Sequence, residues 1–126
     1  LQTLLEDFML KSISSMDGAN EGFYHGMMLG LCAVLGNRYQ VRSNREAGLG
    51  RFDIQLMPLT KGVPGFIFEF KHTNDEHADL ESLAESALRQ IEQKRYDTEL
   101  CDAGVHAVIK IGIAFRGKSA VVRRAS

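Results

Sequence analysis

Apolar and polar positions follow two different periods along the chain, and the change of period predicts which segments are helices and which are strands. Apolar residues recur at helical spacing near the start and again after residue 79, whereas alternation or a continuous apolar run marks the remaining segments. The pattern predicts helices at 1–15, at 21–35 and from an acidic entry at 74–79 to about 96, and strands at 39–43, 51–58, 65–71, 106–115 and 119–122.

The order of these elements predicts the class of fold. Turn-forming residues at 46–50 and 60–65 join the first three strands closely, which favours an antiparallel meander. The following strand–helix–strand step favours parallel pairing of its two strands. In the third strand the phenylalanines share one face, whereas Ile67, Glu69 and Lys71 share the other. We therefore expect an α/β fold in which helices flank a central mixed sheet.

Composition narrows the class of protein. The chain has 126 residues, enough for one domain, and its 44% hydrophobic and 25% charged residues are typical of a soluble globular protein. No apolar run approaches the roughly 20 residues that span a bilayer, and the start lacks a signal-peptide pattern. Because the first residue is Leu1 rather than Met, we expect residues 1–20 to end a preceding region and residues 21–126 to form the domain. Cys32 and Cys101 lie far apart without zinc-site spacing, which favours reduced thiols and a cytoplasmic location.

Charge is balanced overall but uneven along the chain. With 15 basic and 16 acidic residues the net charge is −1, which argues against a protein that coats DNA nonspecifically. Basic residues predominate at 38–51 and 110–126, and acidic residues predominate at 75–102. This distribution is compatible either with a basic edge that guides a polyanion to one side or with ordinary solvated faces.

Two acidic residues lie inside apolar strands and are candidates for binding a cation. Asp53 lies between Phe52 and Ile54, and Glu69 lies between two phenylalanines of the next strand. A buried carboxylate costs free energy unless it is paired or binds a cation, and a hairpin would make these two neighbours. Mg²⁺ prefers one or two such carboxylates and keeps water or phosphate oxygens as further ligands. Lys71 projects from the same face as Glu69, where it would orient water or stabilise charge on a phosphate. The alternative is an exposed Glu69–Lys71 pair with Asp53 in a turn.

The chain resembles a known family through these residues and the segments around them. The resembling segments are Phe23-Tyr24-His25-Gly26, the run from Ser43 to Asp53, Glu69-Phe70-Lys71, Gln90-Ile91 with Lys94 and Tyr96, and the run from Gly112 to Lys118. Together they look like the PD-(D/E)XK nuclease superfamily, specifically a bacterial branch whose nuclease-like domain often follows an AAA-ATPase-like region. Phe52 stands where the motif name has proline, a position that supplies no ligand.

The resemblance implies a restriction-endonuclease-like core, in the order α-β-β-β-α-β, with an extra N-terminal helix. It implies that Asp53 and Glu69 bind Mg²⁺ or Mn²⁺ through their side chains and Phe70 through its backbone carbonyl. Lys71 would position the attacking water, Glu21 would complete the acidic cluster directly or through water, and Gln90 would reach the site from the following helix, as in archaeal-type Holliday junction resolvases. For Glu21 the residues alone also allow a favourable charge at a helix start, and for Gln90 a core hydrogen bond. Candidate contacts to the DNA backbone are Tyr24, Arg45, Arg51 and Tyr96, and His25 is either a neighbour of the site or structural.

The function implied by the resemblance is metal-dependent hydrolysis of DNA phosphodiester bonds by an endonuclease. Branched or Holliday-junction DNA and a homodimer are the expected substrate and assembly, with an ATPase-like region in the same full-length chain. One alternative is a module that keeps the nuclease fold without cutting and serves DNA binding or regulation. Another is a structural dimerisation domain serving the attached ATPase.

Overall fold

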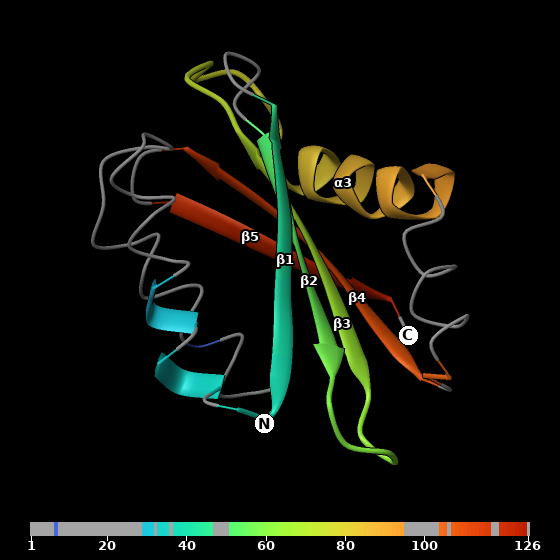
Figure 1. Cartoon of the computed structure of the whole chain (residues 1–126). Coiled ribbons are helices and arrows are strands. Elements are labelled where there is room, and N and C mark those ends of the chain that lie inside the picture. Colours follow the sequence, from blue (N-terminus) through green and yellow to red (C-terminus); the bar gives the residue numbers. More distant parts are fainter. Residues whose placement is uncertain are drawn as a thin grey trace.

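The computed structural model describes residue 7 and residues 29–31, 33–35, 37–46, 51–94, 104–105, 107–116 and 119–125, without the side chains at 45, 46 and 94. The described strands form one five-stranded sheet in the order β1-β2-β3-β4-β5 (Figure 1). Their bounds are β1 Tyr39–Glu46, β2 Arg51–Pro58, β3 Gly65–His72, β4 Val108–Arg116 and β5 Ser119–Ala125, with helix α3 at Leu80–Lys94 between β3 and β4.

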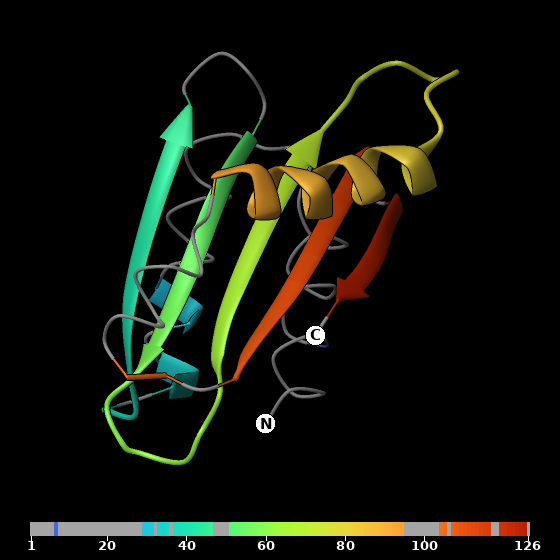
Figure 2. The ribbon, with the colours of Figure 1, turned by 90° about the vertical axis from the view of Figure 1, so that its right-hand side faces the viewer.

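The sheet is mixed, as the sequence predicts. The pairs β1–β2, β2–β3 and β4–β5 are antiparallel, whereas β3–β4, the pair joined through α3, is parallel. Helix α3 crosses one face of the sheet, and the helical residues 29–31 and 33–35 lie on the other (Figures 1 and 2). The predicted α/β class and mixed sheet flanked by helices are therefore confirmed.

Several predicted element boundaries are wrong, and hydrogen-bonded pairing explains the differences. β1 continues through Glu46 rather than ending at residue 43, because its ladder with β2 extends to the pair Glu46↔Arg51. β5 continues to Ala125 rather than 122, because its ladder with β4 reaches Lys110↔Ala125. Arg116 is the last residue of β4 rather than part of a turn. The polar edges of a sheet show no alternation of apolar and polar residues. The hydropathy pattern therefore predicts strands that are shorter than the hydrogen-bonded ladders.

Strand alternation divides the core between the two faces. On one face the phenylalanines of β3 pack with apolar residues of β2 and β4 and with Leu31 and Leu35. On the other face Ile67 packs with Ile91 of α3, and Ala84 of α3 packs with Ala114. The second face is the one that also carries Glu69 and Lys71, so α3 lies on the face of the predicted chemistry.

Gly112 in β4 allows α3 to approach the sheet closely. A Cβ atom at this position would lie 2.4 Å from the backbone oxygen of Ala84 and 2.9 Å from the backbone nitrogen of Leu88. Both atoms belong to the helix backbone, which cannot move aside as a flexible side chain can. A residue without Cβ is therefore required where α3 crosses β4.

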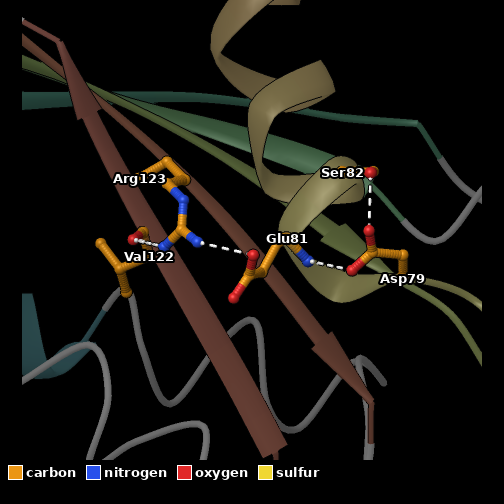
Figure 3. Close-up of polar contacts among 5 residues, drawn as sticks. All are labelled: Asp79, Glu81, Ser82, Val122 and Arg123. Atoms are coloured by element: carbon orange, nitrogen blue, oxygen red, sulfur yellow. Dashed lines mark hydrogen bonds and ion pairs between the residues drawn. The ribbon is translucent and has the colours of Figure 1, made fainter.

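The segment between β3 and α3 is held by side-chain contacts to the backbone. The guanidinium of Arg116 donates hydrogen bonds to the carbonyl oxygens of Asp75 and Ala78, at 2.9 and 3.0 Å. Asp79 caps the helix: one carboxylate oxygen accepts from the Glu81 backbone N–H at 3.1 Å, and the other accepts from the Ser82 hydroxyl at 2.8 Å (Figure 3). Glu81 in turn forms an ion pair with Arg123 of β5 at 3.3 Å (Figure 3). These contacts fix where α3 begins above the sheet.

Replacing Asp79 by Ala is expected to lower the thermal unfolding midpoint at neutral pH, because the first-turn N–H groups lose their acceptor. The hydrogen bonds from Ser82 and Glu81 lower the pKa of Asp79. Its contribution is therefore fully present above the unfolded-state pKa and is lost as the pH falls through the lower folded-state value. Thermal melts between pH 2 and 7 measure this, with Asp79→Ser as the control that keeps a capping oxygen. Equal destabilisation by Ala and Ser at pH 7 would contradict the capping role.

Among the described helical residues, no segment has the length and apolar character needed to cross a membrane.

Candidate active site

Asp53 and Glu69 are neighbours on adjacent strands. They are directly paired in the antiparallel ladder of β2 and β3, and both lie on the face that α3 crosses. Paired positions of this kind place the two Cβ atoms about 5 Å apart. Asp53 is 3% exposed and Glu69 is 1% exposed. The structure therefore brings together two buried carboxylates from strands that the sequence predicted.

Two cationic residues form the next row of the same face. Arg51 is paired with Lys71 across β2 and β3, two positions along each strand from the two acids. Both side chains are half-buried. The start of β2 and the end of β3 lie at the same end of the sheet, where α3 crosses (Figure 2). The site therefore combines two carboxylates and two cations beside one helix.

The apolar residues beside the acids help to set this register. The rings of Phe52 and Phe70 stack on the opposite face of the sheet, with centroids 4.4 Å apart. Because alternate residues point to opposite faces, stacking of these two rings and pairing of the neighbouring Asp53 and Glu69 require the same register. Phe52, which stands where the motif name has proline, thus contributes packing directly behind the acid pair.

Helix α3 supplies the wall of the site beside Lys71. The Lys71 Nζ atom donates a hydrogen bond to the Ser86 hydroxyl oxygen at 3.2 Å. Gln90 is one helical turn further along α3, so it lies on the same side of the helix as Ser86, and it is 8% exposed. This placement on α3 is compatible with the expected role of Gln90.

The donor set fits a divalent cation. The Oδ1 atom of Asp53 and the Oε2 atom of Glu69 are buried and accept no hydrogen bond, although both residues have other polar or electrostatic interactions. Buried carboxylate oxygens on adjacent strands are suitable ligands for Mg²⁺ or Mn²⁺. Within the described residues no group of three or more His, Cys, Asp or Glu side chains is arranged to hold a metal ion. The third acid expected from the sequence, Glu21, lies outside them.

The other candidate residues either lie outside the described residues or are described only by their backbone. Tyr24, His25 and Tyr96 lie outside the described residues. For Arg45 the structure gives only the backbone register, opposite Phe52. The bounds of the domain at 21–126 stay a prediction for the same reason.

His72 lies on the face opposite Lys71, as the alternation predicts. The centroid of its ring lies 5.1 Å from the centroid of the Phe115 ring. Burial lowers the pKa of the His72 imidazole. The side chain therefore favours the neutral form and belongs to the packing of β3 against β4 rather than to the acid pair.

Some of the basic residues in the two basic stretches are engaged in local contacts. Arg38 donates to the backbone carbonyl of Leu35, Arg116 to the segment before α3, and Arg123 pairs with Glu81. These side chains support the fold, so the uneven charge of the sequence is partly structural.

The described residues also line a groove of about 740 Å³ at the other end of the sheet, beside the β2–β3 hairpin. Lys61 is its only charged lining residue within the described part of the chain, and no acid lines it. It lacks the groups that catalysis on a phosphate requires and lies away from the acid pair. Its lining consists of residues 58–64 together with Gly104, Val105, Ala107 and Ile109.

Two further polar residues of this face were given no role by the sequence pattern. Ser86 contacts Lys71 directly, and Asn44 of β1 is an exposed residue paired with Asp53. The sequence feature that could have drawn attention to Ser86 is a serine inside a segment whose other residues favour a helix. Asn44 belongs to the run from Ser43 to Asp53 that carries the family resemblance, but its position opposite Asp53 follows only from the length and register of β1.

The sheet, the crossing helix and the acid pair next to a lysine define a nuclease-like α/β domain. In agreement, comparison with protein families matches residues 19–125 to the PD-(D/E)XK nuclease superfamily. The chain belongs to this superfamily, and the resemblance noted from the sequence is confirmed. Comparisons with curated proteins and with solved structures yield no significant match.

Proposed function

We propose that the chain is a divalent-metal-dependent DNA endonuclease that hydrolyses phosphodiester bonds. The observation that carries the proposal is the pairing of buried Asp53 with buried Glu69, in the row next to Lys71. Packing alone gives no reason to bury two carboxylates side by side. Membership of a nuclease superfamily supports the same reaction class.

Each candidate residue of the chain would have its own role in phosphodiester hydrolysis. Asp53 and Glu69 would hold Mg²⁺ or Mn²⁺, with the Phe70 carbonyl and, directly or through water, Glu21 completing the ligands. The ion would polarise the scissile phosphate and help generate the hydroxide nucleophile. Lys71 would orient the attacking water and balance charge on the phosphate. Gln90 would contact the site from α3, and the DNA backbone would be held by Arg51, Tyr24, Arg45 and Tyr96.

The finer substrate and assembly rest on the resemblance to archaeal-type Holliday junction resolvases. We propose branched or junction DNA as the preferred substrate, cut by a homodimer that presents two sites to two strands. A preceding AAA-ATPase-like region in the full-length chain and a cytoplasmic location belong to the same proposal.

Cleavage of plasmid, linear and four-way-junction DNA tests the proposal. The wild-type chain is expected to cut with Mg²⁺ or Mn²⁺ and to stop when EDTA is added. Asp53→Ala and Lys71→Ala are each expected to reduce the rate about a thousandfold, because each removes a group that acts on the reacting atoms. Lys61→Ala, the same replacement of a lysine in the exposed β2–β3 hairpin, is the matched control and is expected to cut normally.

Two results would contradict the proposal. One is the absence of cutting by the wild type with either metal on all three substrates. The other is unchanged cutting by both Asp53→Ala and Lys71→Ala. DNA binding without any cutting would instead favour a module that keeps the nuclease fold for binding alone.

A further inference from the structure

Ser86 is the residue of α3 that contacts Lys71. Its hydroxyl oxygen lies 3.2 Å from the Lys71 Nζ atom and 2.7 Å from the backbone carbonyl oxygen of Leu83. Both Lys71 and Ser86 are half-buried, so the contact is partly shielded from solvent. It joins the end of β3 to the middle of the helix that crosses it.

The chemistry of the hydroxyl fixes the direction of both hydrogen bonds. A serine hydroxyl has one proton, and the Leu83 carbonyl is only an acceptor, so the proton is donated to Leu83. The Ser86 oxygen must then act as acceptor towards Lys71, whose ammonium is only a donor. This chain of two bonds uses one of the three N–H donors of Lys71 and thereby sets the direction of the other two.

We propose that Ser86 is a positioning residue, which holds the Lys71 ammonium in the orientation that phosphodiester hydrolysis requires. The proposal rests on the proposed nuclease function, since it assigns Ser86 a role through Lys71. A lysine has a flexible four-carbon stem, so its charged end needs a fixed partner to stay in one place. Ser86 supplies one such partner, from a helix whose own position is fixed by Asp79, Arg116 and the close contact with Gly112.

Kinetics of DNA cleavage by Ser86→Ala test the role on the reaction. We expect kcat to fall about tenfold, because a hydrogen bond to a charged group is lost, while KM stays within about twofold of the wild type. Alanine is the strongest helix former, so the variant is expected to keep α3. Ser86→Thr is expected to restore most of kcat, because a helical threonine hydroxyl makes the same bond to the preceding turn.

The matched control is Ser82→Ala, the same replacement one turn earlier on α3. The Ser82 hydroxyl contacts Asp79 rather than Lys71. Ser82→Ala should therefore leave kcat unchanged at a temperature at which the protein is folded. An equal loss in both serine variants would show that the effect comes from general weakening of the helix and would overturn the proposal.

A second readout does not depend on activity. The ¹H–¹⁵N signal of the Lys71 ammonium, identified by its absence in Lys71→Ala, reports protection of its protons from exchange with water. It is expected in the wild type and in Ser86→Thr, and it is expected to be lost in Ser86→Ala. An unchanged signal in Ser86→Ala, or an unchanged kcat, would overturn the positioning role. If the wild type cuts no DNA, the proposed function fails, while this signal still decides whether Ser86 holds Lys71.

Discussion

Replacing Glu69 by Gln is expected to reduce DNA cleavage by about a thousandfold or more, while the chain keeps its fold. Glutamine has nearly the same shape but supplies a neutral amide in place of a carboxylate. The site would then keep one of its two described acids, and a divalent ion would lose the negative charge of one carboxylate ligand. Because the ion would activate the reacting phosphate and water, the loss should appear in kcat.

The same variant should lose the stabilisation that a bound ion provides. At a Mn²⁺ concentration of about 100 times Kd, binding to the folded state alone adds about 2.7 kcal/mol. For a domain of this size that corresponds to a rise of about 10 °C in the unfolding midpoint. Thermal melts of wild type and Glu69→Gln, with and without Mn²⁺, measure the difference, and Glu85→Gln on the exposed side of α3 is the matched control. An equal rise in all three proteins would contradict a role for Glu69 in binding.

Replacing Gly112 by Ala is expected to destabilise the chain by about 3 kcal/mol, at the upper end of the usual cost of overpacking. The added Cβ would meet the backbone of α3 at Ala84 and Leu88, so the helix must move away from β4. A shift of α3 would also carry Ser86 away from Lys71. We therefore expect lower kcat even at temperatures where the variant is folded.

Chemical denaturation measures the stability effect. The control is Gly62→Ala, where no atom lies within 4 Å of the added Cβ but the backbone has a φ of 88°. Its expected cost is only the roughly 1 kcal/mol of placing alanine in a left-handed conformation. If Gly112→Ala were no more destabilising than Gly62→Ala, the close approach of α3 to β4 would not be a determinant of the fold.

The central strands could be predicted from the sequence because both of their faces are constrained. The bounds of β2 match the prediction, and β3 differs only by the added His72. Alternation around Phe52 and Phe70 also placed Asp53 and Glu69 on one face. Where apolar side chains must point to a core, a shift by one residue would bury the wrong set, so pattern and register agree.

The edges of the sheet and the helix contact could not be predicted in the same way. The ends of β1 and β5 are polar, and backbone pairing with the neighbouring strand sets where they lie. Backbone pairing does not require an alternation of apolar and polar residues, so hydropathy does not predict these ends. The contact between Lys71 and Ser86 depends on where α3 crosses the sheet. That crossing depends on Gly112. The effect of Gly112 on packing follows from the close approach of α3 to β4, which the sequence pattern does not give.

The most direct test of the central claim is a crystal of the chain soaked in Mn²⁺, measured for anomalous scattering. We predict a peak between the carboxylates of Asp53 and Glu69, with metal–oxygen distances of about 2.2 Å, and no such peak in Glu69→Gln. A wild-type crystal without a peak at this pair, or with Mn²⁺ bound only elsewhere, would contradict the claim that these two buried acids form a metal centre.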